Sequence, residues 1–169
     1  MTPSALWRPV AAMLVFGALG GVVWRLLAKP ALWEVTDRGI VLTEDASTAR
    51  FGVIVVFVLI GVVVSLVWGW YLGGRFHAAR WPIVLVAGVT AFVAGVLAWR
   101  VGVWLGPPDP SSVEGLGSGD TVPQQLEIDT LAPFLVWPIA ALASLLWRVY
   151  SAGDGSHDGG RHVDEIDRA

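Results

Sequence analysis

The sequence predicts an all-α protein, an antiparallel bundle of four transmembrane helices. Of its 169 residues, 55% are apolar and 15% are charged, and the mean hydropathy is +0.66. Soluble domains carry about 25% charged residues, so this chain has too few charges to cover a globular surface. Four apolar stretches approach or exceed, at about 1.5 Å per residue, the ~30 Å hydrocarbon core of a bilayer. We expect spans at residues 10–28, 51–72, 82–105 and 131–150.

The first span follows Arg8, which gives it a weakly positive start. Its apolar run continues to Ala28 without a clear A-x-A cleavage site. We therefore interpret residues 10–28 as a retained helix and not as a signal peptide. Residues 1–150 then form one transmembrane domain.

The connections before and after the third span differ in charge. The shorter one, "GGRFHAARW", contains Arg75 and Arg80 and no acid, whereas residues 106–130 contain five acids and no Lys or Arg. Cytoplasmic connections carry an excess of Lys and Arg. We therefore expect a multi-pass plasma-membrane protein with both termini in the cytoplasm.

Two arginines lie near the expected outer ends of the first and third spans. Arg25 follows Trp24, and Arg100 follows Trp99. We interpret both tryptophans as interfacial anchors whose N–H groups meet the lipid headgroups. An arginine at this depth can extend toward water along its aliphatic stem, which limits the cost of inserting it.

Similar acidic segments precede the second and fourth spans. "EDASTARF" (44–51) and "EIDTLAPF" (127–134) each place an acid seven residues before a phenylalanine. The same order of features therefore occurs twice along the chain: a Trp-Arg pair, proline, an outer loop, an acidic pair, a phenylalanine and a descending helix. This order fits two parallel helical-hairpin repeats. The alternative is chance similarity between apolar helices.

Two roles are open for the paired Trp-Arg motifs. In the first, Arg25 and Arg100 form ion pairs at the outer rim, as partly buried charges usually do. In the second, both bind an anionic lipid headgroup, because guanidinium can contact phosphate through two hydrogen bonds. The acids available for the ion pairs are Glu44, Asp45, Glu127 and Asp129.

Small residues recur at four-residue spacing in three of the spans. Such a row lies on one helix face and lets helix backbones approach closely. The predicted helix-packing ridges are Gly17 and Gly21; Gly61, Ser65, Gly69 and Gly73; and Ala94, Ala98, Gly102 and Gly106. The third span has a second row, Ala87, Ala91 and Gly95, so one of its ridges could serve a partner or a second copy.

No residue set points to catalysis, a cofactor or a metal. The chain has no cysteine, and acids and histidines are absent from the middle of the spans, which argues against proton-coupled transport. The tail contains His157 and His162 beside several acids. Its many glycines and few apolar residues instead predict a disordered cytoplasmic segment over residues 151–169.

Four segments resemble an uncharacterised actinobacterial family of small four-helix integral membrane proteins, known by a domain-of-unknown-function label. They are "VVWRLLAKP", "LTEDASTARFG", "AWRVGVWLGPP" and "FLVWPIAAL". The resemblance covers roughly residues 10–150, and the arginine-tryptophan segment of the third span is its most specific part. It implies a plasma-membrane protein with four spans and transfers no catalytic residues.

These observations favour an integral membrane protein that is not an enzyme. The leading hypothesis is an accessory or assembly subunit that contacts another cell-envelope component, either a membrane protein or a second copy of the chain. We expect no nucleic-acid partner. The alternative is a binder or carrier of an anionic lipid at the outer leaflet, acting through Arg25 and Arg100.

Overall fold

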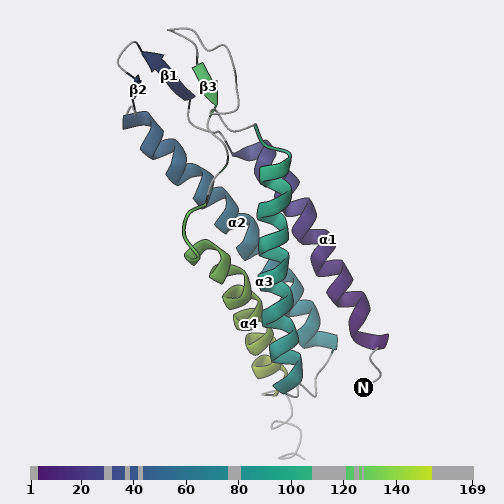
Figure 1. The fold of residues 1–169 in the computed structure, drawn as a ribbon. Helices are drawn as coiled ribbons and strands as arrows, with labels where there is room; N and C mark the ends of the chain where they lie inside the picture. Colours follow the sequence, from purple (N-terminus) through teal and green to yellow (C-terminus); the bar gives the residue numbers. More distant parts are fainter. Residues whose placement is uncertain are drawn as a thin grey trace, which may run out of the picture.

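The computed structural model describes residues 4–28, 32–36, 39–41, 44–75, 81–107, 121–123, 126 and 128–153. Within these ranges, four long helices form a bundle, and three short strands lie beyond one of its ends (Figure 1). The helices are α1 (Ser4–Leu27), α2 (Glu44–Arg75), α3 (Trp81–Trp104) and α4 (Ala132–Gly153). All four contain a stretch long and apolar enough to cross a membrane. The predicted four-helix fold class is confirmed, and the two helical-hairpin repeats stay a prediction.

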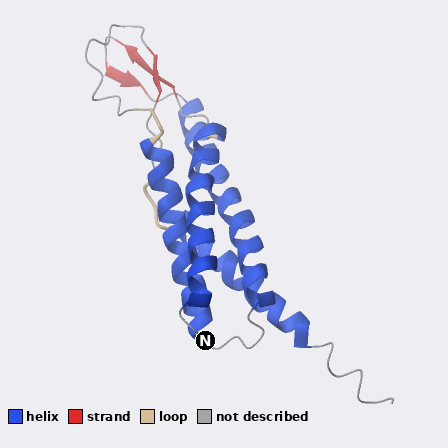
Figure 2. Cartoon of the chain, turned by 90° about the vertical axis from the view of Figure 1, so that its right-hand side faces the viewer, coloured by secondary structure: helices blue, strands red, loops and turns tan. Residues whose placement is uncertain are grey.

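The strands β1 (Leu32–Thr36), β2 (Gly39–Val41) and β3 (Thr121–Pro123) form one antiparallel sheet in the order β2-β1-β3. Val35 is opposite Ile40, and Trp33 is opposite Val122. The sheet therefore joins the α1–α2 connection to the α3–α4 connection, two segments for which the sequence predicted only loops. We call this end of the bundle the sheet end, and the end where α1 begins and α4 stops the terminal end (Figure 2).

Two helices begin six or seven residues before the predicted spans. Helix α1 begins at Ser4, before the expected start at residue 10, and α2 begins at Glu44, before residue 51. Acidic residues stabilise the first turn of a helix because the helix dipole is positive there. The acidic segment before the second span is therefore the first part of α2. In α4, Pro133 lies in the first turn, where its missing N–H breaks no helical bond.

Helices adjacent in sequence run antiparallel, yet the most extensive contacts join parallel helices, α1 with α3 and α2 with α4. Contacts between α3 and α4 are next, those between α1 and α2 are sparser, and α2 hardly touches α3. The α2–α3 hairpin thus crosses a diagonal of the bundle. Hydropathy predicts which segments cross a membrane and leaves their neighbours undetermined, which is why this arrangement was not foreseen.

The centre of the bundle is filled by aromatic rings. Phe57 of α2 lies 5.3 Å from Trp24 of α1, 5.4 Å from Phe134 and 5.7 Å from Trp137 of α4, measured between ring centroids. These edge-on and tilted arrangements suit the ring quadrupoles. Toward the sheet end, Leu126 and Ile128, which precede α4, are also buried and add to the core.

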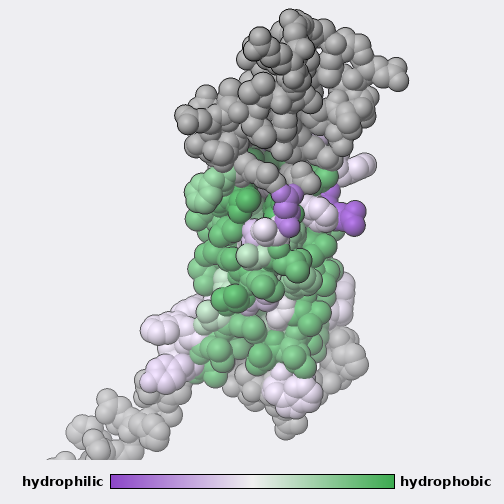
Figure 3. All heavy atoms as spheres, turned by 60° about the vertical axis from the view of Figure 1, so that its left-hand side comes forward, coloured by the Kyte–Doolittle hydropathy of each residue, from purple (hydrophilic) through white to green (hydrophobic). Residues whose placement is uncertain are grey.

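The outer surface of the bundle is apolar. Figure 3 shows hydrophobic side chains covering the visible face of the helices between the two ends. Leu26 of α1 and Trp104 of α3, for example, are 77% and 84% exposed. This exposed apolar surface is far more extensive than the apolar patches of soluble monomers. It is the surface that a lipid bilayer covers.

Candidate functional site

Helices α1 and α3 touch through backbone at two glycines. A Cβ added at Gly17 would lie 2.7 Å from the carbonyl oxygen of Ala94, and one added at Gly21 would collide with the carbonyl oxygen of Ala98. Real Cβ atoms do not approach other atoms so closely. The structure thus places the first-span ridge directly on the Ala94 and Ala98 ridge of α3.

Helices α2 and α4 meet in the same way. A Cβ at Gly69 would collide with the carbonyl oxygen of Ala141, and a Cβ at Gly73 would lie 2.8 Å from Cβ of Arg148. Ser65, between the predicted ridge glycines, is fully buried, and its Oγ has no hydrogen-bond partner among the described residues. The second-span ridge is therefore enclosed in the bundle.

Trp137 of α4 occupies a socket made by glycines of three other helices. Its ring is fully buried. Hypothetical Cβ atoms at Gly61 of α2, Gly95 of α3 and Gly20 of α1 all have this ring among their nearest neighbours, at 3.0 Å for Gly95 and 3.6 Å for Gly20. Trp137 is not among the residues for which the sequence predicts a role. The available signal was a tryptophan inside an apolar span whose neighbours contain several glycines.

The prediction of a spare ridge on α3 is wrong. Ala94, Ala98 and Gly102 face α1, while Ala87 and Ala91 are fully buried and Gly95 lies against Trp137. Both rows of small residues are thus used inside the bundle. Gly106, beyond the end of α3, lies nearest to its own preceding turn and to Leu126, so it is not part of a helix–helix ridge.

The two predicted interfacial anchors face the bundle interior. Trp24 is fully buried against Gly102, and its Nε1 donates a hydrogen bond of 2.8 Å to the carbonyl oxygen of Val53. Trp99 is half-buried, and its ring lies 5.8 Å from that of Phe134, measured between centroids. Its Nε1 is buried and has no hydrogen-bond partner among the described residues. The anchor prediction is therefore wrong for both. Depth in the membrane suggested it, but the Trp24 ring fills the space that Gly102 leaves, and the Trp99 ring packs against Phe134.

Arg25 and Arg100 lie in different settings. Arg25 is half-buried, and its Nε donates a 3.0 Å hydrogen bond to the carbonyl oxygen of Leu105, just past the end of α3. The last carbonyls of a helix lack partners within the helix and carry partial negative charge, so a cation stabilises them. Arg100 is exposed, with its guanidinium carbon 5.1 Å from the ring centroid of Trp99, a cation–π distance.

The acidic side chains predicted to pair with these arginines are mostly outside the described part of the protein. Glu127 and the side chains of Glu44 and Asp45 fall there, as do residues 154–169 with the two histidines. Residues 151–153, predicted as the start of the disordered tail, are instead the end of α4. Asp129 is exposed between β3 and α4. The ion pairs therefore stay a prediction. Among the described residues, no group of three potential ligands could hold a metal ion.

Two tryptophans connect α1 to α2 through backbone carbonyls. Besides the bond from Trp24 to Val53 near the sheet end, Nε1 of Trp68 in α2 donates a 3.0 Å bond to the carbonyl oxygen of Pro9 in α1, near the terminal end. Both bonds are buried. We call them the two tryptophan clamps. A third bond, of 2.6 Å from Ser144 Oγ to the carbonyl oxygen of Leu66, joins α4 to α2.

Arg148, the remaining arginine of the spans, lies at the terminal end. Its guanidinium carbon is 5.0 Å from the ring centroid of Trp70, and its aliphatic stem packs on Gly73. Arg148 falls inside the fourth predicted span, residues 131–150, and no contact was predicted for it. Its cation–π contact and packing explain how α4 accommodates this charge beside α2.

The fold and these contacts define a small four-span membrane bundle with an extramembrane sheet. Comparison with models of known protein families, with curated proteins and with solved structures found no match for this chain. The resemblance to the four-helix actinobacterial family therefore stays a prediction.

Proposed function

We propose that this chain is an accessory or assembly subunit, not an enzyme, whose helix bundle presents the sheet to another component of the cell envelope. The observation that carries the proposal is the packed interior. Trp24, Phe57 and Trp137 fill the middle of the bundle, and the ridges of small residues are in contact with one another. A bundle packed in this way is well suited to act as a rigid membrane anchor.

The sheet end is the part that we propose meets the partner. In the order β2-β1-β3, each of β2 and β3 has only β1 as a neighbour among the described strands. Edge strands offer backbone N–H and C=O groups that can pair with an extended segment of another chain. The ridges inside the bundle are already occupied, which favours an extramembrane contact over a transmembrane one.

For the orientation, we propose that the terminal end faces the cytoplasm of a plasma-membrane protein. Among the described side chains, three arginines lie toward this end, Arg8, Arg75 and Arg148, and two lie toward the sheet end, Arg25 and Arg100. Among the side chains that the structure describes, the one carboxylate is Asp129, which precedes α4 toward the sheet end. An excess of arginine is typical of the cytoplasmic side.

Copurification from native membranes after mild cross-linking tests the proposed function. We expect one protein to accompany the wild-type chain in stoichiometric amount. Ile40→Pro, which removes a backbone N–H from β2, should release it. Leu146→Ala, on the exposed outer face of α4, is the matched control and should retain it. Equal recovery with all three chains, or no accompanying protein, would contradict the proposal.

The exposed position of Arg100 keeps one alternative function open, the binding of an anionic lipid at the outer leaflet through Arg25 and Arg100. Polar lipid bound to the purified wild type and lost from an Arg25→Ala/Arg100→Ala double variant would favour this alternative. A double-mutant cycle of Arg100→Ala with Glu127→Ala, measured as bundle stability in detergent, tests the competing ion pair. Additive losses would exclude that pair.

A further inference from the structure

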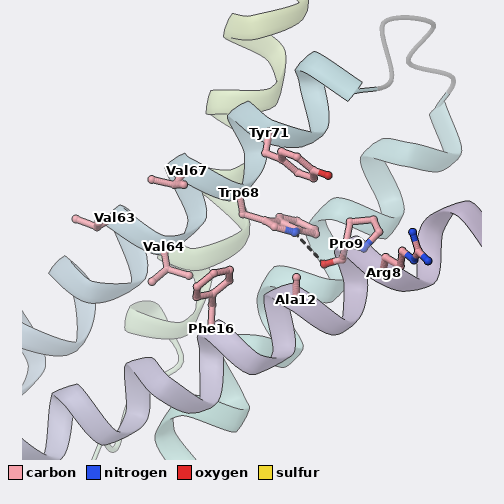
Figure 4. Close-up of a pocket in the computed structure, with 9 residues that line it drawn as sticks. All are labelled: Arg8, Pro9, Ala12, Phe16, Val63, Val64, Val67, Trp68 and Tyr71. Atoms are coloured by element: carbon pink, nitrogen blue, oxygen red, sulfur yellow. Dashed lines mark hydrogen bonds between the residues drawn. The ribbon is translucent and has the colours of Figure 1, made fainter.

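A furrow runs along the outside of the bundle between α1 and α2. Its part nearer the terminal end has a volume of about 580 Å³ and is lined by apolar side chains that include Phe16, Val63 and Val67 (Figure 4). A second hollow of about 390 Å³ continues it toward the sheet end, and the two share Phe16, Val63 and Val64. The two hollows adjoin at these shared residues, and we call them together the α1–α2 furrow.

The two tryptophan clamps explain why the furrow exists. The bond from Trp68 to Pro9 holds α1 against α2 near the terminal end, and the bond from Trp24 to Val53 holds them near the sheet end. Between the clamps the two helices make few contacts, because α1 packs on α3 and α2 packs on α4. The furrow is the space left between two helices that are fixed at both ends.

The furrow is long enough to hold a lipid chain across one leaflet. Its lining on α1 runs from Arg8 to Val23, which is about 22 Å at about 1.5 Å per residue. One leaflet contributes about half of the ~30 Å hydrocarbon core. An acyl chain that enters from the terminal end therefore fits along the furrow down to the middle of the membrane.

The terminal end of the furrow is polar and cationic. Arg8 and Tyr71 both line it there, and both are exposed (Figure 4). Helix α1 begins only four residues before Arg8, so the positive end of its dipole is close to the guanidinium group. No carboxylate of the described side chains lies at this end to neutralise Arg8. A negatively charged headgroup is complementary to such a mouth.

We propose that the α1–α2 furrow binds one anionic phospholipid, with an acyl chain against Phe16, Val63 and Val64 and the phosphate at Arg8 and Tyr71. Arginine contacts a phosphate through two hydrogen bonds, and the tyrosine hydroxyl can donate a third. Trp68 positions the site by fixing the main chain of α1 at Pro9, next to Arg8. This site lies at the opposite end of the bundle from Arg25 and Arg100 and is independent of a protein partner at the sheet.

Native mass spectrometry of the full chain in mild detergent tests the site, with dioleoylphosphatidylglycerol and dioleoylphosphatidylcholine offered at equal concentration. We expect one retained phospholipid per chain and a preference of about fivefold for phosphatidylglycerol, the effect of one basic residue at an anionic lipid surface. Arg8→Gln should abolish this preference. Arg75→Gln, which removes an exposed arginine at the end of α2 outside the furrow, is the matched control and should keep it.

A second pair of variants tests the seat of the acyl chain. Ala12 is exposed within the furrow, so Ala12→Leu fills space without disturbing the core and should reduce binding of both lipids. Ala143→Leu makes the same change in the separate groove between α2 and α4 and should leave binding unaltered. Equal effects of the two arginine variants, or of the two alanine variants, would overturn the proposal. So would a dimer that Ala12→Leu dissociates, since a second copy would then occupy the furrow.

Discussion

The parallel helix pairs and the α1–α2 pair are held together by different means. Between α1 and α3, and between α2 and α4, glycines have no side chain to separate the helices, so the backbones are in contact. Between α1 and α2, two indole N–H groups reach across to main-chain carbonyls, and an open furrow remains between them. The first kind of contact is continuous and tight, whereas the second fixes two points and leaves the rest open to lipid.

This difference follows from what stabilises helices in a bilayer. Lipid chains are as apolar as leucine, so helices associate through close packing and interhelical hydrogen bonds. The parallel pairs depend on packing, and the α1–α2 pair depends on hydrogen bonds. Mutations that alter volume and mutations that remove a donor should therefore separate the two kinds of contact.

The largest effect should come from emptying the glycine socket. Trp137→Ala removes a fully buried ring that touches three helices, and a loss of about 3–5 kcal/mol in unfolding free energy is typical of such a truncation. Trp104→Ala removes a ring that is 84% exposed and is the control. Unfolding by dodecyl sulfate, followed by circular dichroism, measures both. Similar losses for the two variants would show that the socket does not carry the packing.

Crowding a parallel pair should have the next largest effect. Gly21→Val drives a branched side chain into the main chain of Ala98, and overpacking of this kind costs about 1–3 kcal/mol or more. At Gly52 of α2 an added Cβ meets nothing within 4 Å, so Gly52→Val is the matched control. The same unfolding assay should find Gly52→Val close to wild type. A tolerated Gly21→Val would contradict the close contact of α1 with α3.

Removing a tryptophan clamp should cost less. Trp24→Phe and Trp68→Phe each keep an aromatic ring and lose one N–H donor, and interhelical hydrogen bonds in a membrane contribute about 0.6 kcal/mol on average and at most about 1.7. Trp147→Phe, at an exposed ring of α4, is the control. A pair of cysteines, one on α1 and one on α2, should also be cross-linked by reagents of a wider range of lengths in both clamp variants, because the spacing of the two helices is then less fixed. Unchanged cross-linking would mean that the clamps do not set the spacing.

The smallest effect should follow Ser144→Ala. This change removes the bond from Ser144 Oγ to the carbonyl oxygen of Leu66, a contact within a pair that backbone packing already holds. We expect about 0.6 kcal/mol or less. Ser151→Ala should be neutral, because the Ser151 hydroxyl donates within its own helix, to the carbonyl oxygen of Arg148. A loss as large as that of Gly21→Val would show that hydrogen bonding also controls the parallel pairs.

The spans could be predicted because membrane insertion depends mainly on the length and hydropathy of a segment. The expected start at Pro82 and end at Leu105 of the third span, for instance, each differ by one residue from α3. The small-residue rows were also visible, because four-residue spacing places residues on one helix face. Their partners were not visible, since a glycine row looks the same whichever helix it meets.

The roles of the tryptophans could not be read from the sequence for a related reason. Trp24 and Trp137 lie at depths where an anchor, a core residue and a lipid-facing residue all have similar sequence surroundings. Burial of a large ring requires a gap on another helix, which Gly102 supplies for Trp24 and Gly61 and Gly95 supply for Trp137. The sheet was missed because its strands are three to five residues long, too short for an alternating pattern to emerge.

Both clamps end on main-chain oxygen atoms, and this has a consequence for how the sequence can change during evolution. Any amino acid at position 53 supplies the same acceptor to Trp24, so the identities at positions 24 and 53 need not vary together. Methods that infer proximity from correlated substitutions should therefore miss this bond, although they should detect volume exchange between Trp24 and Gly102. The tryptophan itself, as the sole donor, would be the invariant member of each pair in homologous chains.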